Sequence, residues 1–228
     1  VTRSGQVMIA THEKADGDAL GASLGLLRIL RGAGLRAACL SMGELPRRLE
    51  VFVKKGEILP AGPVEIARDT VLVVLDCSDE ERLAASKREL LPRFNVVNID
   101  HHVSNTDFGD VSWVDPEASC VGEMIYGLAT QAGWAVSAQA AEALWVALVT
   151  DTGRFSYGNT SSAALRVAAE LVDIGVDTAR VNRWLYERRE AREVRLLGRA
   201  IESLEIHAQG RAASVCLSLE DFDELIAE

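Results

Sequence analysis

The sequence predicts an α/β protein with a mainly parallel sheet flanked by helices. Short apolar runs alternate with segments of helical periodicity in the first half of the chain, as buried strands and their crossover helices do. Of the 228 residues, 48% are hydrophobic and 25% are charged, which is the balance of a folded globular domain. The apolar runs fall well short of the roughly 20 residues that a membrane-spanning helix requires, so we expect no membrane partner.

The first predicted elements are a strand at residues 6–11, a polar loop, and a helix with leucines at helical spacing from Leu20 to Leu30. Further strands are predicted at residues 37–42, 71–75 and 96–99, with helical or irregular segments between them at 45–54 and 80–88. After Asn105 the periodicity is helical, at residues 119–131, 137–149, 161–173 and 178–187. We therefore expect the strands first and mostly helices after them.

A connector helix at residues 190–205 is predicted from the apolar side chains on one of its faces, which are Val194, Leu197, Ile201 and Leu204. A strand-like run at 212–217 and a helix start at Ser218 follow. We therefore expect a first domain at 1–188, a connector at 189–208 and the beginning of a second, truncated α/β domain at 209–228. Because Val1 is not Met and no C-cap signal precedes Glu228, we expect a longer protein.

The charge balance limits the classes of partner. The chain has 24 Lys and Arg against 34 Asp and Glu, a net charge of −10, which argues against coating long duplex nucleic acid with basic surface. A phosphate partner must then be held locally. The four cysteines show neither disulfide nor zinc spacing and no signal peptide opens the chain, so we expect a cytoplasmic protein.

Aspartate and histidine residues gather where predicted strands or apolar helices end. The positions, in chain order, are His12, Asp16, Asp18, Asp76, Asp100, His101, His102 and Asp151. Because the carboxyl ends of parallel strands meet at one crevice, four separate segments could build one site there. Each segment also has a local alternative: Asp76 could cap a helix, and Asp16 to Asp18 could form a turn.

A metal site accounts for the four segments together. Clustered carboxylates repel one another unless a multivalent cation neutralises them, and two divalent ions would balance four aspartates. A shared carboxylate such as Asp76 could bridge two ions about 3.5–4 Å apart. Imidazole and carboxylate ligands without thiolate suit Mn, Fe, Co or Zn.

The four segments resemble, in order, the motifs of the DHH phosphoesterases. The matching residues are Thr11 to Gly21, Leu75 to Ser78, Asn98 to His102, and Val149 to Gly153. Asn105, the segment 113–119, Arg154 and Phe155 are most similar to the nanoRNase and pAp phosphatase branch. That branch degrades very short oligonucleotides and often removes phosphate from 3′-phosphoadenosine 5′-phosphate. The resemblance implies these substrates, either a short oligonucleotide or a nucleoside bisphosphate.

The resemblance also implies roles for individual residues. One metal ion would be held by His12, Asp16 and Asp76, and a second by Asp18, Asp76, His101 and Asp151. Manganese is the expected ion, and a water between the two ions would attack phosphorus. Asp100 would orient His101, and His102 would hydrogen-bond the phosphate, with Asp76 completing the catalytic set. Substrate contacts would come from His102, Arg154, Asn105 and Ser119, residues 209–228 would begin a DHHA1-like substrate-binding domain, and a homodimer is left open.

Several competing functions remain open. A manganese pyrophosphatase or exopolyphosphatase has similarly arranged ligands, and a cyclic-dinucleotide phosphodiesterase is a further alternative. A phosphatase with an aspartate nucleophile would need that residue at the strand end, whereas Asp16 lies five residues past Thr11. A non-enzymatic alternative is a metal-binding regulatory module, which would bind metal tightly without releasing phosphate.

Overall fold

In the computed structural model, residues 5–60 and 69–226 are described. The chain divides into two compact units, Val1–Val181 and Asn182–Glu228. Val1 and Glu228, on which the expectation of a longer protein rests, lie outside the described residues. Within the described ranges, no helix is both long enough and apolar enough to cross a bilayer.

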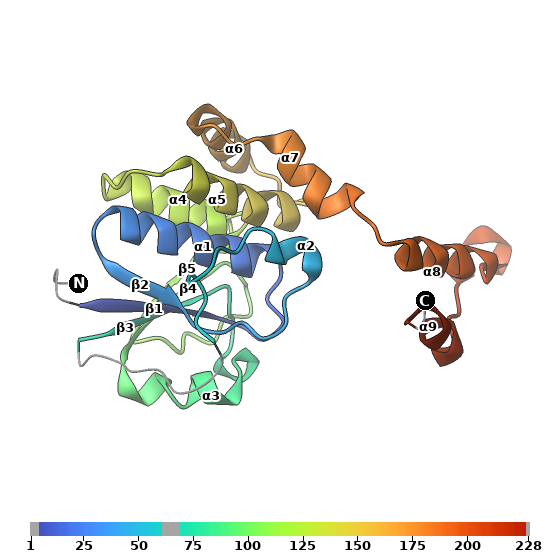
Figure 1. Cartoon of the computed structure of the whole chain (residues 1–228), viewed down its shortest axis with the longest axis horizontal. Coiled ribbons are helices and arrows are strands. Elements are labelled where there is room, and N and C mark those ends of the chain that lie inside the picture. Colours follow the sequence, from blue (N-terminus) through green and yellow to red (C-terminus); the bar gives the residue numbers. More distant parts are fainter. Residues whose placement is uncertain (1–4, 61–68, 227–228) are drawn as a thin grey trace. The chain divides into compact units, whose positions relative to one another are not determined.

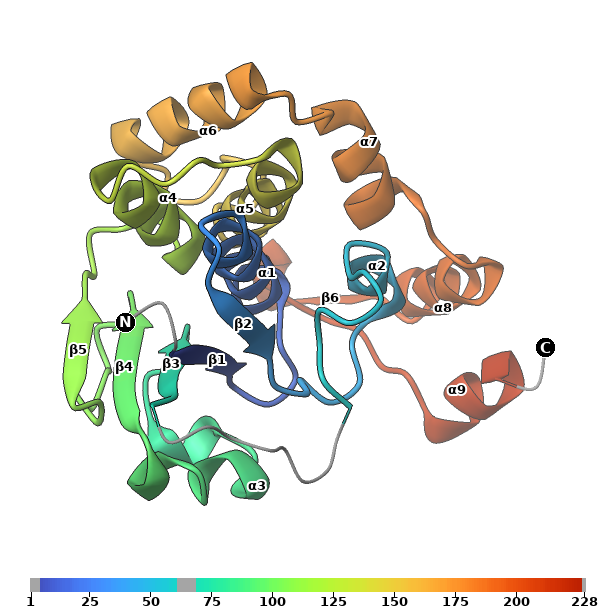
Figure 2. The same ribbon diagram turned by 60° about the vertical axis from the view of Figure 1, so that its left-hand side comes forward.

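The first unit is built on a five-stranded sheet in which every neighbouring pair is parallel. The strands are β1 (Gln6–Thr11), β2 (Arg36–Cys39), β3 (Val71–Leu75), β4 (Asn95–Asp100) and β5 (Val111–Val114). Their order is β2-β1-β3-β4-β5, with β5 at one edge beside β4 (Figure 2). In this doubly wound order the direction of chain winding reverses between β1 and β3, and ligands bind at such a reversal. We therefore expect a ligand site at the carboxyl ends of β1 and β3.

Helices cover one face of the sheet in two layers (Figure 1). The inner layer contains α1 (Gly17–Gly32), α4 (Val121–Gln131) and α5 (Ala138–Asp151), and α6 (Ser162–Ile174) packs outside α4 and α5. A side chain at Gly21 would place its Cβ 2.5 Å from the carbonyl oxygen of Ala143 in α5. The glycine therefore permits close packing of α1 on α5.

The opposite face carries short helical segments: η1 (Glu80–Arg82), α3 (Ala85–Arg88) and η2 (Leu91–Arg93). Met8, Leu72, Val74 and Val96 form a buried core on this side of the sheet, together with Leu83. A further short helix, α2 (Arg47–Glu50), follows β2. The central strands β1 and β3 are thus buried on both faces, which explains their continuous apolar sequences.

The chain then leaves the first unit through α7 (Thr178–Asn182) and a π-helical turn, η3 (Arg183–Glu187). The second unit contains α8 (Ala191–Glu202), the antiparallel pair β6 (Glu205–His207) and β7 (Ala212–Ser214) with the 3₁₀ turn η4 (Ala208–Gly210) between them, and α9 (Leu219–Ile226). The helix expected at 190–205 is therefore present as the shorter α8.

The predicted α/β class and parallel sheet are confirmed. The strands at 6–11 and 71–75 have the predicted bounds. Two strands were missed: the short edge strand β5, and β6, which the prediction included in the connector helix and the turn after it. Both are short, and β6 is exposed along its whole length, so neither shows the continuous apolar run by which buried strands are recognised.

Candidate metal centre

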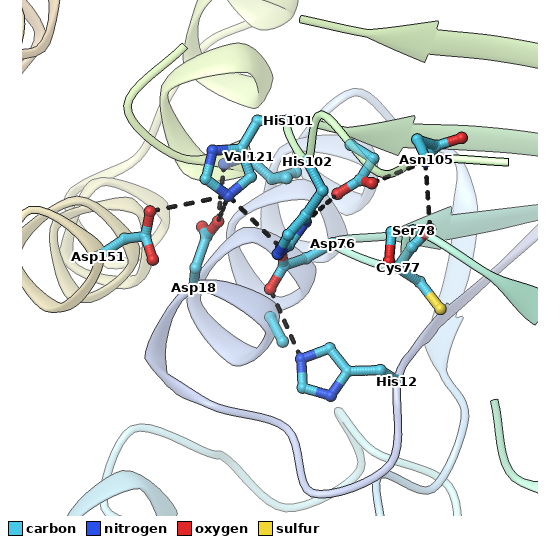
Figure 3. A network of polar contacts seen from close by, with 12 residues as sticks. His12, Asp18, Asp76, Cys77, Ser78, His101, His102, Asn105, Val121 and Asp151 are labelled. Carbon is cyan, nitrogen blue, oxygen red and sulfur yellow. Dashed lines mark hydrogen bonds and ion pairs between the residues drawn. The ribbon is translucent and has the colours of Figure 1, made fainter. Parts of the chain in front are cut away.

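The predicted acidic and histidine residues meet at the carboxyl edge of the sheet (Figure 3). His12 directly follows β1, Asp76 directly follows β3, and His101 and His102 follow β4. Asp18 lies in the first turn of α1, and Asp151 is the last residue of α5. Segments that are far apart in the sequence thus form one cluster at the reversal between β1 and β3.

Asp76 lies at the centre of this cluster. Its carboxylate oxygens are 3.6 Å from His12 Nε2, 3.8 Å from His101 Nε2 and 3.6 Å from His102 Nδ1. The residue is 2% exposed, and its φ of 53° lies in the left-handed region that few non-glycine residues adopt. Backbone strain of this kind is typical of functional positions, and here it directs the carboxylate toward three imidazoles.

His12 directs one ring nitrogen into the site. Its Nδ1 lies 2.6 Å from the carbonyl oxygen of Glu13, which leaves Nε2 facing Asp76. Within the described residues, His12 Nε2 and Asp76 Oδ1 are buried and have no hydrogen-bond partner. The Asp76 carboxylate raises the pKa of His12. Together with Asp16, these two residues offer three ligand atoms within 4.8 Å of one another, a group that could hold a metal ion.

His101 is arranged in the same way around a second group. Its Nδ1 lies 3.2 Å from the carbonyl oxygen of Ala118, and its Nε2 faces the carboxylates of Asp18 at 3.9 Å, Asp76 at 3.8 Å and Asp151 at 3.7 Å. The group Asp18, His101 and Asp151 also brings its ligand atoms within 4.8 Å. A histidine bound through Nδ1 to a backbone carbonyl presents Nε2 as a ligand, which is the usual support for metal-binding imidazole.

The N-terminus of α4 holds Asp18 in place. Its two carboxylate oxygens accept hydrogen bonds from the amides of Val121 at 2.7 Å and Gly122 at 3.0 Å. Burial, together with the negative charges of Asp76 and Asp151, nevertheless raises the pKa of Asp18 well above its usual value. Burial, with further contributions from Asp76 and Asp16, raises the pKa of Asp151 to about 6. The carboxylates thus repel one another, and a bound cation would relieve that repulsion.

His102 has a different partner from its neighbour. Its Nδ1 donates to Asp100 Oδ1 at 2.7 Å, and this hydrogen bond raises the pKa of His102. The expectation that Asp100 orients His101 is therefore wrong. Side chains on alternate residues of an extended chain point the same way, so Asp100 shares a side with His102 and not with His101.

Asn105 hydrogen-bonds the carboxylate oxygen of Asp100 that His102 does not contact. The Asn105 amide donates to Asp100 Oδ2 at 2.7 Å and to Asn98 Oδ1 at 2.9 Å. Although burial acts against it, the hydrogen bonds from His102 and Asn105 lower the pKa of Asp100, so the residue stays ionised. Both amide protons of Asn105 are engaged within the protein, and its expected substrate contact stays a prediction.

Among the remaining expected substrate contacts, that of Ser119 is corrected. It is fully buried, and its hydroxyl donates to the carbonyl oxygen of Asn159 at 2.5 Å. Ser119 therefore supports the loop that follows Asp151 and has no surface to offer a ligand. Arg154 is exposed on that loop, with a φ of 60°, and its substrate contact stays a prediction.

One cation near the site was not predicted. Arg82 ends η1, and its Nη1 donates to Ser78 Oγ at 3.4 Å, just past Asp76 in the chain.

Comparison with known proteins decides the family. The model of the DHH family, N-terminal domain, matches residues 6–148. The chain belongs to the DHH family. The bifunctional oligoribonuclease and PAP phosphatase NrnA of Thermus thermophilus is 34% identical to this DHH protein over 97% of the chain and 68% of that relative. The protein of the same name from Bacillus subtilis is 29% identical over 97% of the chain and 70% of its own length.

A solved structure extends the comparison to the fold. An exopolyphosphatase-related protein from Bacteroides fragilis has a TM-score of 0.87 against this DHH chain, at 23% sequence identity. The similarity covers 97% of the present chain and 68% of that protein. It shows that both units have counterparts in a related fold.

Proposed function

We propose that this DHH chain is a metal-dependent phosphoesterase that hydrolyses short oligonucleotides, 3′-phosphoadenosine 5′-phosphate, or both. The proposal is carried by the position of Asp76, whose one carboxylate lies within 4 Å of three imidazoles. It is supported by relatives named oligoribonuclease and PAP phosphatase that match almost the whole chain. The net charge of −10 favours a short substrate held at the metal site over a long duplex.

We further propose two divalent ions, most simply Mn²⁺, sharing Asp76. His12, Asp16 and Asp76 would hold one, and Asp18, Asp76, His101 and Asp151 would hold the other. The fit rests on the unpartnered His12 Nε2 and Asp76 Oδ1 and on a donor set of imidazole and carboxylate without thiolate. When bound, the ions would neutralise the carboxylates and lower the pKa of a water that serves as nucleophile.

The protein's own groups would act on the phosphate. His102 is partly exposed, and Asp100 accepts its Nδ1 proton, so in the protonated ring Nε2 can donate a hydrogen bond to a phosphate oxygen. The carboxylate of Asp100 raises the pKa of His102, which favours the protonated ring. A fixed donor of this kind stabilises the charge that develops on the phosphate oxygens in the transition state. Arg154, on the loop after Asp151, remains a proposed substrate contact.

The second unit is assigned a separate role. We propose that residues 189–208 are a connector and that residues 209–228 begin a substrate-binding domain. The separation of Asn182–Glu228 from the first unit supports this division, because all the proposed metal ligands belong to Val1–Val181.

The decisive experiment is an activity panel with Mn²⁺ on the purified protein. The substrates are 3′-phosphoadenosine 5′-phosphate, a dinucleotide, pyrophosphate and a cyclic dinucleotide. We expect phosphate from the first or mononucleotides from the second, and loss of both after chelation with EDTA. Hydrolysis of pyrophosphate or the cyclic dinucleotide alone would replace the proposal with the corresponding alternative, and tight metal binding without hydrolysis would favour a regulatory module.

Asp76→Asn provides the matched variant for that panel. It removes the shared charge with little change in shape, and it should lower activity by at least about 10²-fold and reduce the bound metal. Asp173→Asn makes the same charge change on the exposed side of α6 and should do neither. Two metals per chain and near-normal turnover in Asp76→Asn would show that Asp76 is not the shared ligand.

A further inference from the structure

Arg82 is fixed at the junction of three loops that carry the site. Its carbonyl oxygen accepts from the amide of Glu13 at 2.9 Å, which ties it to the loop of His12. Its own amide donates to the carbonyl oxygen of Asp79 at 3.1 Å, in the loop that follows Asp76. The carbonyl oxygen of Ser78, to whose hydroxyl the Arg82 guanidinium is bonded, accepts from the amide of Thr106 at 2.8 Å, in the loop that follows His102. The backbone of Arg82 is thus bonded to the loops of His12 and Asp76, and Ser78 joins the latter loop to that of His102.

The guanidinium of Arg82 remains available for an anion. Arg82 is exposed, and a single contact to the neutral Ser78 hydroxyl engages one of the five N–H donors of an arginine. In residues 5–60 and 69–226 no carboxylate forms an ion pair with it.

An exposed arginine on the loop that follows Asp76 is suited to phosphate. Guanidinium matches two phosphate oxygens at once, and an isolated positive charge on a chain of net charge −10 concentrates anionic ligands locally. His102 lies against Asp76, where the cleaved phosphate would be, whereas Arg82 is anchored at Ser78, further along the loop. The proposed substrates can carry a second phosphate beside the one that is cleaved.

We propose that Arg82 binds the non-scissile phosphate of the substrate, such as the 5′-phosphate of a dinucleotide. This inference rests on the proposed function and adds a substrate-positioning residue to it. A guanidinium held by its backbone between the loops of His12, Asp76 and His102 would set the distance between the terminal phosphate and the cleaved bond. The residue therefore contributes to affinity for phosphorylated ends and leaves the chemical step to the metal site.

The test compares two dinucleotides that differ only at the 5′ end: pApA, which carries a 5′-phosphate, and ApA, which does not. The variants are Arg82→Gln, Arg82→Lys and, as a control of equal charge change, Arg88→Gln on the exposed side of α3. Steady-state kinetics with Mn²⁺ give KM and kcat separately, and thermal unfolding verifies that each variant is folded. In Arg82→Gln we expect KM for pApA to rise about tenfold or more, as for loss of a charged hydrogen bond, with kcat nearly unchanged.

The second substrate and the other variants make the result specific. KM for ApA should stay within about twofold in Arg82→Gln, Arg82→Lys should lie between the wild type and Arg82→Gln for pApA, and Arg88→Gln should match the wild type. An equal loss on pApA and ApA, or no loss on either, would overturn the role of Arg82 and leave the proposed function standing. Failure of the wild type to cleave either dinucleotide or 3′-phosphoadenosine 5′-phosphate would instead overturn the proposed function, and this inference with it.

Discussion

Asp100 Oδ1 accepts a 2.7 Å hydrogen bond from Nδ1 of His102, and this contact distinguishes two adjacent histidines. His101 has its Nδ1 against a backbone carbonyl and directs Nε2 at three carboxylates. His102 has its Nδ1 against a carboxylate, which favours the protonated ring. One imidazole is therefore prepared as a metal ligand and the next as a hydrogen-bond donor.

This difference predicts that one alanine variant loses bound metal and the other loses turnover. His101→Ala should lose bound metal, because it removes an imidazole ligand. His102→Ala should keep its metal and lose roughly 10²–10³-fold in kcat, as for loss of one transition-state hydrogen-bond donor. Metal analysis after gel filtration, together with kcat on a dinucleotide, decides between these outcomes. Equal metal loss in both variants would mean that the two roles have been divided incorrectly.

The support from Asn105 predicts an energetic coupling with His102. Asn105→Ala removes a 2.7 Å hydrogen bond to Asp100 and should lower kcat about tenfold, on the scale of losing a partner that orients an active-site group. If Asn105 acts through His102, the same change in a His102→Ala background should cost little more. The measurement is a double-mutant cycle on kcat with metal content followed in parallel. Independent losses that multiply would assign Asn105 a role outside this chain of hydrogen bonds.

Helix packing beneath the site can be tested with two glycines of α1. Gly21→Ala would place a methyl group 2.5 Å from the carbonyl oxygen of Ala143, and such overpacking should cost about 1–3 kcal/mol of unfolding free energy. For Gly32, at the end of the same helix, no described atom beyond its chain neighbours and the adjacent helix backbone lies within 4 Å of the position that a Cβ would take. Gly32→Ala should therefore be neutral or stabilising by up to about 1 kcal/mol. Urea unfolding of both variants checks the difference, and equal stabilities would contradict the tight contact of α1 with α5.

The positions of the metal site could be predicted from the sequence because they depend on topology. A strand with a continuous apolar run, such as Val71–Leu75, ends where a polar residue begins, and parallel strands bring those ends together. The edge strand Val111–Val114 escaped prediction because Val111 is 60% exposed and Trp113 is 38% exposed, so the run is not one of buried residues.

The partners of individual side chains could be predicted only in part. The contact of Asp100 with His102 follows from the alternation of side chains and was within reach of the sequence. The contact of Ser119 with Asn159 joins residues 40 positions apart and depends on how the end of α5 packs beside the start of α4. Nothing local in the sequence indicates that pairing, so a buried serine could not be told from an exposed one.

The crowding of carboxylates predicts that Asp151→Asn stabilises the metal-free protein but reduces the stability gained from a bound metal ion. Burial and the charge of Asp76, with Asp16, raise the pKa of Asp151 from 3.8 to about 6 in the metal-free protein. Because the folded state holds this proton more tightly than the unfolded chain does, the group's contribution to stability is present below pH 4 and is lost as pH rises through 6. Asp151→Asn removes that loss and should stabilise the metal-free protein by about 1–3 kcal/mol at pH 8, with a smaller gain at pH 5.

With Mn²⁺ bound, the wild type should be more stable than Asp151→Asn, the reverse of the order expected without metal. The ion binds the ionised carboxylate in the folded state, so the wild type should gain more stability from saturating Mn²⁺ than Asp151→Asn does. Thermal unfolding at pH 5 and pH 8, with EDTA or with Mn²⁺, gives the four comparisons needed. A variant that is less stable than the wild type at pH 8 even in EDTA would show that Asp151 is compensated within the protein and that the cluster does not require a cation at this position.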